Sequence, residues 1–431
     1  MKAIFATKVP YKMLSMAIIV ALSGCSEGEN TSQADSHKDG HPHHTVMSRF
    51  AITELDSNAL YVLDGKQFKT LQQFTLPNSP SALKTSPNGR YALAMQRMQD
   101  RIDVIDSGIN AEEHGDHFHL HAHSPKLLTV SYDGIRPTHY DIGQGVASVF
   151  YDGNGAAGQN AKFQVVNDSS IAQGTAIAEH KFAYAVHGTA QIIGDYAFTG
   201  VKDPAQEGLP SEVVLLKRHH DHFHSDKQFA AQECLGLHGS AQSKTQLAFG
   251  CTDGVVHISI NGSTITPTKI PNPTELAEDA RIGTIWGFPT QDKLLAYAGR
   301  SQQVFAIQDN KLIEIKWQQS EGEKAQLFSQ SQDGLIILST SGQLHLFSAA
   351  KDFSHSKTIS LWDALPKDDA KPSARVQIAE DKRTGQLIVT DPINNELLQV
   401  NLKNSAVVRH PLSFSPNLIT WVGTTEEEYH H

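Results

Sequence analysis

Two stretches of sequence decide the fold: HGTAQIIGDYAFTG at residues 187–200 and HGSAQSKTQLAFGCTDG at residues 238–254. Each starts with His-Gly, runs through a short β-rich segment to a polar turn, and continues into a second, more apolar segment. Apolar runs of four to six residues between turn residues are typical of buried β-strands. Both stretches therefore predict the same pair of antiparallel strands.

Similar units recur along most of the chain. Further copies start at Ser81, Thr138, Ile282, Ala325 and Arg375, and the turns of the seven copies fall near Gly89, Gln144, Gly194, Lys244, Asp292, Gly334 and Gly385. These turns are about 49 residues apart, and a period of about 40 to 50 residues with about four strands per repeat is typical of β-propeller blades. We therefore expect an all-β fold, an eight-bladed β-propeller. A seven-bladed ring is the alternative if one weak copy is a loop.

The two ends of the repeat region complement each other. Residues 50–77 look like a blade that lacks its innermost strand, and NLITWV at residues 417–422 follows the outer strands of the last blade. Pairing between these segments would close the ring and remove exposed sheet edges. The expected propeller spans residues 49–424, and residues 425–431 form a tail.

The N-terminal region has the features of an export signal. Lysines at positions 2, 8 and 12 precede an apolar run at residues 13–22 that is too short to span a bilayer. Leu-Ser-Gly-Cys at residues 22–25 matches the lipobox of bacterial lipoproteins. This pattern predicts a signal peptide at residues 1–24, lipidation of Cys25, and a disordered tether at residues 25–48. Because Ser26 and not aspartate follows Cys25, we expect an anchor in the outer membrane, facing the periplasm of a Gram-negative bacterium.

Two cysteines, Cys234 and Cys251, remain after the predicted processing. An even number of cysteines in an oxidising compartment suggests a disulfide, which would stabilise the chain by about 3 kcal/mol. A zinc-binding thiolate pair is the alternative.

The composition points to metal ions and away from nucleic acids. The net charge is −10, and the sequence contains no basic stripe. The chain has 23 histidines and only six methionines. Histidine is a common zinc ligand, so zinc is the expected cofactor.

Most of these histidines fall into short groups. The predicted capture arm in the tether contains His37, His41, His43 and His44. A second group, which follows His114, contains His117, His119, His121 and His123, and its alternation places the side chains on one face of an extended strand. A third group contains His219, His220, His222 and His224 beside Asp221, and predicts either a second metal site or a solvated hairpin tip.

Three further histidines share a position in the repeat. His139, His187 and His238 stand at the start of the innermost strand in three consecutive copies. Innermost strands line a propeller channel, so we expect the three imidazoles to converge at one mouth, with a donor from residues 117–123 completing a tetrahedral zinc site. Asp141, Asp152 and Asp195 are candidates to orient the imidazoles. The alternative is that each histidine caps its own strand.

Several of these motifs resemble the AztD family of periplasmic zinc metallochaperones. The match is clearest in CLGLHGSAQSKTQLAFGCTDGVV, with support from RPTHYDIGQGVASVFYDGNG and VHGTA. The resemblance implies an eight-bladed propeller, a Cys234–Cys251 disulfide, a His-rich N-terminal segment, and a zinc site near the channel mouth. It also implies delivery of zinc to the binding protein of an ABC importer. The lipobox and the histidines at residues 219–224 depart from the family pattern, and both fit storage or sensing at a membrane.

Two other classes of function remain as alternatives. The protein could be a propeller whose sole function is to act as a protein-interaction scaffold. Such a scaffold would not need so many histidines. A zinc-dependent hydrolase would need an open metal position and a nearby general base. The sequence contains no HExxH or GxSxG motif. We therefore expect a zinc-binding protein that is not an enzyme.

Overall fold

The computed structural model describes residues 47–115, 117–226 and 228–426 of the 431-residue chain. The predicted signal peptide, Cys25 and the four arm histidines lie outside the described residues, as do the side chains of His114 and His117.

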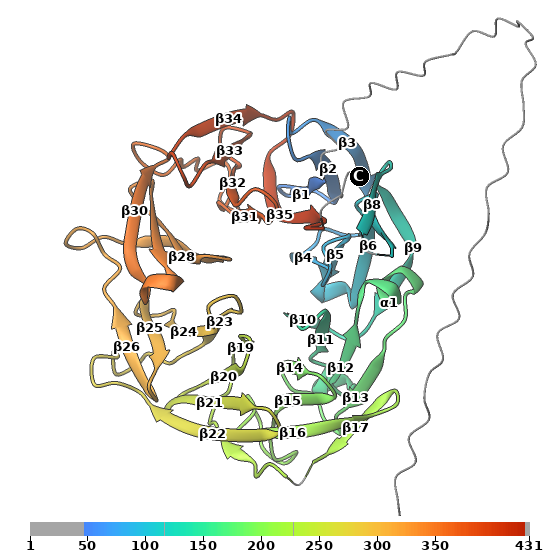
Figure 1. Ribbon diagram of the computed structural model, residues 1–431, viewed down its shortest axis with the longest axis vertical. Coiled ribbons are helices and arrows are strands. Elements are labelled where there is room, and N and C mark those ends of the chain that lie inside the picture. Colours follow the sequence, from blue (N-terminus) through green and yellow to red (C-terminus); the bar gives the residue numbers. More distant parts are fainter. Residues whose placement is uncertain (1–46, 116, 227, 427–431) are drawn as a thin grey trace, which may run out of the picture. The chain divides into compact units, whose positions relative to one another are not determined.

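The described chain is built almost entirely from antiparallel β-strands. It forms six separate four-stranded sheets and one nine-stranded sheet. The nine-stranded sheet contains two further groups of four strands. These groups succeed one another around a ring (Figure 1). The all-β propeller predicted from the repeat is confirmed.

The strands group as follows, each from the innermost to the outermost strand. The first three groups are β35 (Pro416–Gly423), β1 (Ser48–Glu54), β2 (Ala59–Asp64) and β3 (Thr70–Thr75); β4 (Ala82–Thr85), β5 (Tyr91–Gln96), β6 (Arg101–Asp106) and β9 (Lys126–Asp133); and β10 (Pro137–Gly143), β11 (Val146–Tyr151), β12 (Lys162–Val166) and β13 (Ala178–Lys181). The next three are β14 (Ala190–Ile193), β15 (Tyr196–Val201), β16 (Glu212–His219) and β17 (His222–Ser225); β19 (Ser240–Gln242), β20 (Gln246–Cys251), β21 (Gly254–Asn261) and β22 (Thr264–Pro271); and β23 (Thr284–Phe288), β24 (Lys293–Ala298), β25 (Gln303–Gln308) and β26 (Lys311–Ile315). The last two are β27 (Ala325–Ser331), β28 (Gly334–Ser339), β29 (Gln343–Ser348) and β30 (Ser354–Ser360); and β31 (Ile378–Asp381), β32 (Gln386–Asp391), β33 (Glu396–Val400) and β34 (Val407–Pro411).

In the described residues, three short strands, one α-helix and three single-turn 3-10 helices lie outside this pattern. The hairpin of β7 (Ile109–His114) and β8 (His117–Ala122) is inserted between β6 and β9, and β18 (Gln232–Glu233) pairs with β16. The helix α1 (Asp168–Gln173) is capped by Asn167, whose side chain accepts a hydrogen bond from the Ser170 backbone nitrogen.

The turns and the closing pair follow the sequence pattern. The predicted turns lie between the first and second strands of seven groups, and Gly89, Gln144 and Gly194 have φ values of 89°, 51° and 58° there. At the other end of the chain, β35 pairs with β1 in antiparallel register, with Trp421 opposite Phe50. This is the pairing expected for residues 417–422.

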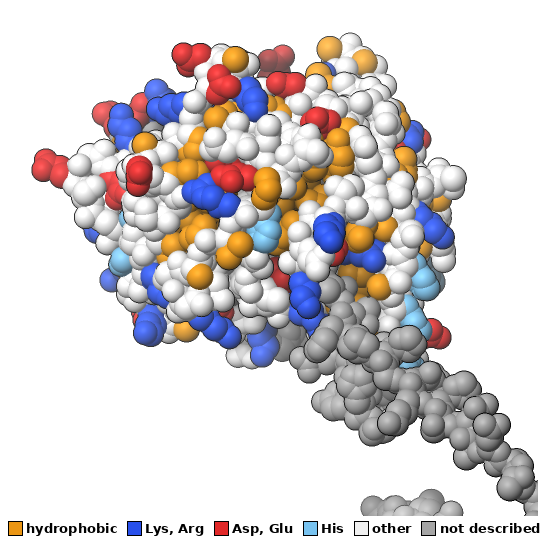
Figure 2. Space-filling model, turned by 90° about the horizontal axis from the view of Figure 1, so that it is seen from above, with side chains coloured by type: hydrophobic (Ala, Val, Ile, Leu, Met, Phe, Trp, Pro, Cys, Tyr) orange, Lys and Arg blue, Asp and Glu red, His pale blue; other side chains and the backbone are white. Residues whose placement is uncertain are grey.

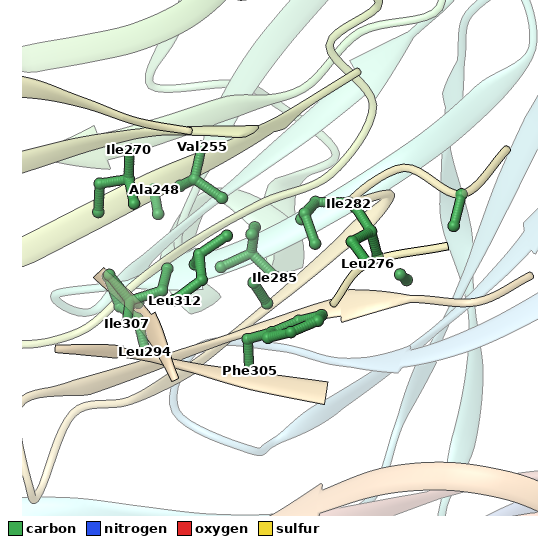
Figure 3. Close-up of a cluster of buried hydrophobic side chains, with 13 residues drawn as sticks. Ala248, Val255, Ile270, Leu276, Ile282, Ile285, Leu294, Phe305, Ile307 and Leu312 are labelled. Atoms are coloured by element: carbon green, nitrogen blue, oxygen red, sulfur yellow. The ribbon is translucent and has the colours of Figure 1, made fainter. Parts of the chain in front are cut away.

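The core lies between neighbouring sheets. Figure 3 shows one such cluster, in which Ala248 and Val255 of one sheet face Ile285, Leu294 and Phe305 of the next. These side chains are at most 4% exposed, and their burial drives the sheets together. On the side of the ring shown in Figure 2, charged side chains of both signs share the surface with hydrophobic ones.

Antiparallel order gives the ring two distinct faces. Every innermost strand runs in the same sense, so His139, His187 and His238 lie where these strands begin, which we call the start face. The opposite side, where the innermost strands end at residues such as Gly423, is the end face. Met47 lies on the end face, because its carbonyl accepts a hydrogen bond from Thr424.

Candidate metal centre

The three repeat histidines are held by the local structure at the start of the innermost strands. His139 lies within β10, at a register shift between Pro137 and Tyr140. Such a bulge changes the direction in which a side chain points. His187 and His238 lie three and two residues before β14 and β19.

The glycine that follows His238 is required by close packing between blades. A Cβ atom on Gly239 would lie 2.6 Å from the Gly283 carbonyl oxygen, and a Cβ atom on Gly188 would lie equally close to the Phe150 ring. The repeated His-Gly dipeptide therefore lets the backbone behind each histidine pack directly against a neighbouring element.

The three imidazoles converge on one another. The ring centroids are 4.8 Å apart for His139 and His187, 5.1 Å for His187 and His238, and 5.9 Å for His139 and His238. All three side chains are half-buried. The structure thus brings together residues that are about 50 positions apart in the sequence.

Hydrogen bonds fix the orientation of two of these rings. His187 Nδ1 lies 2.9 Å from Asp152 Oδ2, and His238 Nδ1 lies 2.8 Å from the Gly283 carbonyl oxygen. Both partners accept a hydrogen bond from the Nδ1–H group, which leaves Nε2 of each ring with a lone pair. A carboxylate or carbonyl in this place is the usual outer partner of a zinc-bound histidine.

The spacing of the ring nitrogens can be compared with a tetrahedral zinc site. His139 Nε2 and His187 Nε2 are 3.2 Å apart. Zinc–nitrogen bonds of about 2.0 to 2.1 Å in a tetrahedron place neighbouring ligands about 3.3 to 3.4 Å apart. However, no group of three or more His, Cys, Asp or Glu side chains in the described part of the chain already has the full arrangement of a metal site. The donor types and this one distance fit zinc, and ring rotations are needed to bring all three nitrogens to it.

Burial favours the neutral form of two of the three ligand candidates. Burial, together with neighbouring His187 and His238, lowers the pKa of His139 to about 3. Burial also lowers the pKa of His238. Burial alone would raise the pKa of Asp152, but its hydrogen bond and charge interaction with His187 lower it overall. Neutral His139 and His238 suit a divalent cation, because protons do not compete for their nitrogens at neutral pH.

A disulfide fixes the segment that carries His238. Cys234 and Cys251 are bonded with a sulfur–sulfur distance of 2.09 Å, which confirms the predicted disulfide and excludes the thiolate pair. It ties the segment before β19 to the end of β20, and the His238 backbone nitrogen donates to the Gly250 carbonyl in the same place.

The β7–β8 hairpin, whose histidines at residues 117–123 were predicted to supply a fourth ligand, lies on the opposite face of the ring. The β7–β8 hairpin continues from Asp106 at the end of β6, and Asp106 pairs with Tyr91 at the start of β5. This edge belongs to the end face. The other end of β5 leads to Arg97, which donates hydrogen bonds to Thr138 and Asp152 on the start face. The six residues of β5, about 20 Å of strand, separate the start face from the end face.

On the end face, His119 and His121 of β8 and His123 just after it alternate along one exposed side of the hairpin. The rings of His121 and His123 are 6.2 Å apart and nearly parallel, and His121 Nε2 lies 3.7 Å from Glu112 Oε2. His119 pairs with Glu112 across the hairpin and is also exposed.

Of the three aspartates considered as orienting groups, one contacts an imidazole in the described structure. Asp152 bonds His187, whereas Asp141 accepts a hydrogen bond from Thr189, and Asp195 bonds Arg218 on the end face. Sequence reasoning missed Arg97, whose Nη2 lies 2.6 Å from Asp152 Oδ2. Its position between blades gave no sequence signal.

The channel between the two faces contains a cavity. Its volume is about 740 Å³, and the innermost strands line it with side chains that include Lys84, Asp141, Trp286, Lys382 and Trp421. Burial raises the pKa of Asp141 to about 6, against the opposing effects of its hydrogen bond with Thr189 and of Lys84.

The described residues contain no helix that is both long enough and apolar enough to cross a membrane.

Comparisons with known proteins support the resemblance noted in the sequence. The chain is 26% identical to the zinc chaperone AztD of Citrobacter koseri (strain ATCC BAA-895 / CDC 4225-83 / SGSC4696) over 243 residues, which is 56% of this chain and 54% of that protein. The aligned region thus spans about half the length of this relative. No protein-family model matches the chain.

Solved structures show the same fold. The crystal structure of Citrobacter koseri AztD superposes with a TM-score of 0.73 at 21% identity, covering 89% of this chain and 99% of that chain. The structure of apo AztD from the same organism gives a TM-score of 0.72 at 21% identity, covering 88% and 99%. The chain is therefore AztD-like in sequence and in fold.

Proposed function

We propose that this protein is a periplasmic zinc chaperone or zinc store that binds zinc at the start face through His139, His187 and His238. The observation that carries the proposal is the convergence of these three half-buried rings, two of them oriented through Nδ1. The similarity to a protein named a zinc chaperone supports the same conclusion.

The geometry suits reversible binding. Three imidazoles supply three of the four ligands of tetrahedral zinc, and the fourth position is left for water or for a ligand from a receiving protein. A receiving protein can then bind the metal before the chaperone releases it. The zinc-binding protein of an ABC importer is the partner that we propose.

The proposed cellular setting follows from the sequence. Export by the signal peptide and lipidation of Cys25 would tether the protein to the outer membrane on its periplasmic side. The histidines at positions 37, 41, 43 and 44 would capture zinc. A tethered protein cannot diffuse freely to an inner-membrane importer, and this favours a storage role beside delivery.

The central experiment is an equilibrium competition for zinc between a chelator and the purified protein. His187→Ala should weaken the tightest class of zinc site by more than about 100-fold, since loss of an outer partner alone costs about 10- to 100-fold. Asp152 keeps its ion pair with Arg97 in this variant. His257→Ala is the control, because His257 is also half-buried and bonds Gln246 outside the site. Equal affinity in the two variants would refute the assignment.

The role of the arm can be tested separately. Deletion of residues 37–44 should slow zinc uptake from a dilute zinc solution, measured by stopped-flow competition, and leave the equilibrium affinity of the tightest class unchanged. If tight binding disappears with the deletion, its ligands lie in the arm and the start-face site is wrong.

A further inference from the structure

The tip of the β16–β17 hairpin carries a second cluster of histidines. The two strands are joined by His220 and Asp221, with His220 in a left-handed conformation at φ 59°. His219 pairs directly with His222 across the hairpin, and His224 follows on the same strand. Cross-strand partners and residues two apart project from the same face of a sheet, so His219, His222 and His224 share one face.

The three rings are close together. The centroids of His222 and His224 are 4.6 Å apart, and the His219 ring lies 5.8 Å from His222 and 6.1 Å from His224. These separations are similar to those among the start-face histidines. All three side chains are exposed, so an ion can reach them directly from solvent.

An aspartate holds one of these rings in the orientation that a metal needs. His222 Nδ1 lies 2.9 Å from Asp221 Oδ1, so Nδ1 carries a proton and donates a hydrogen bond to the carboxylate. Nε2 of His222 therefore has the lone pair, and it points to His224 Nε2 at 2.8 Å. One proton lies between these two nitrogens, and it belongs to His224.

The lysine that shares this face of the hairpin does not block it. Lys217 pairs with His224 across the hairpin, but its Nζ lies 5.8 Å from the centre of the Tyr196 ring on β15. Arg218, on the opposite face of the strand, is bonded to Asp195. The site thus offers three imidazoles and the carboxylate of Asp221. Glu179 of β13, the strand partner of His222, is held by Lys162 and Lys181.

We propose that His219, His222 and His224 form a second, exchangeable zinc site, in which Asp221 is a positioning residue. Zinc takes the place of the proton between His222 Nε2 and His224 Nε2, His224 carries its proton on Nδ1 instead, and the two Nε2 atoms separate from 2.8 Å to about 3.3 Å. The inference stands on the hairpin geometry alone and does not depend on the start-face site. Because the hairpin tip is on the end face, this zinc would exchange independently of zinc at the start face.

The test is chemical modification of histidines in the full mature protein, resolved residue by residue by mass spectrometry, with zinc chloride as the only added ligand. Zinc should slow the modification of His219, His222 and His224 with the same midpoint zinc concentration for all three. This midpoint should not depend on the protein concentration. Exposed His355 on β30 should be unaffected. The His187→Ala protein should show the same protection, which separates this site from the proposed function.

Two variants separate ligation from a simple change of structure. His222→Gln should abolish zinc protection of His219 and His224, whereas His355→Gln should leave it unchanged. Asp221→Asn should raise the zinc concentration needed for protection by about tenfold, as expected for an outer partner. Modification rates at the tip that do not respond to zinc in the wild-type protein would overturn the proposal. Protection that survives His222→Gln would overturn it as well.

Discussion

The two faces of the ring use the same residue type in opposite settings. On the start face, three histidines from consecutive blades meet at the channel, and the side chains of His187 and Asp152 are only 28% and 6% exposed. On the end face, the β16–β17 tip takes its histidines from a single hairpin, and the side chains of His222 and Asp221 are 48% and 87% exposed. Half-buried imidazoles packed between blades have less freedom to lose when zinc binds than exposed ones, which must be ordered at that moment. The comparison predicts tight binding on the start face and rapid exchange on the end face.

The strongest test of this difference removes the disulfide. Cys234→Ser with Cys251→Ser should lower the free energy of unfolding by about 3 kcal/mol, because the unfolded chain regains the freedom of the closed loop. The tightest class of zinc site should also weaken, since the bond ties down the segment that carries His238. Urea unfolding and chelator competition measure the two effects.

The end face serves as the internal control for this variant. Zinc protection at His222 should stay the same, because β16 and β17 are held together by their own backbone pairing. Equal weakening at both faces would mean that the disulfide acts on the whole ring and not on the start-face site.

A smaller effect is expected from the carboxylate behind His187. Asp152→Asn should weaken the tightest zinc class by about 10- to 100-fold, because the carboxylate orients the ring and raises the basicity of Nε2. Asp195→Asn is the matched control, since Asp195 bonds Arg218 on the end face. Chelator competition on both variants gives the ratio of their zinc affinities. If the two affinities are equal, Asp152 serves only its ion pair with Arg97.

The sequence predicted the start face better than the end face, and strand order explains why. The repeat placed His139, His187 and His238 in equivalent positions, and equivalent positions in a ring of blades must lie on the same face. The β7–β8 insertion follows a third strand, and in an antiparallel blade the connection after the third strand lies on the end face. The order of the strands along the chain is therefore enough to separate residues 117–123 from the channel histidines.

Other parts of the site depend on packing that no local pattern encodes. Arg97 reaches Asp152 from the neighbouring blade, and His238 is oriented by the carbonyl of Gly283, 45 residues away. Both contacts follow from how adjacent sheets pack side by side. The repeated His-Gly dipeptide partly predicts the close approach at Gly239. It does not predict that the atom approached is the Gly283 carbonyl oxygen.

The smallest expected effect concerns Asp141, which lies along β10 between the two faces. Its pKa is raised to about 6, so the folded protein holds this proton more tightly than the unfolded chain. Stability should therefore fall as the pH rises from about 4 through about 6, and the cost should be fully present above that range. Asp141→Asn keeps an acceptor for Thr189 and removes the buried charge. The variant should be more stable than the wild type near neutral pH and equal to it near pH 4, as measured by urea unfolding. A difference in stability that is the same at both pH values would show that Asp141 is not the titrating group. Zinc affinity at both faces should be unchanged, because the side chain bonds Thr189 and no imidazole in the described structure.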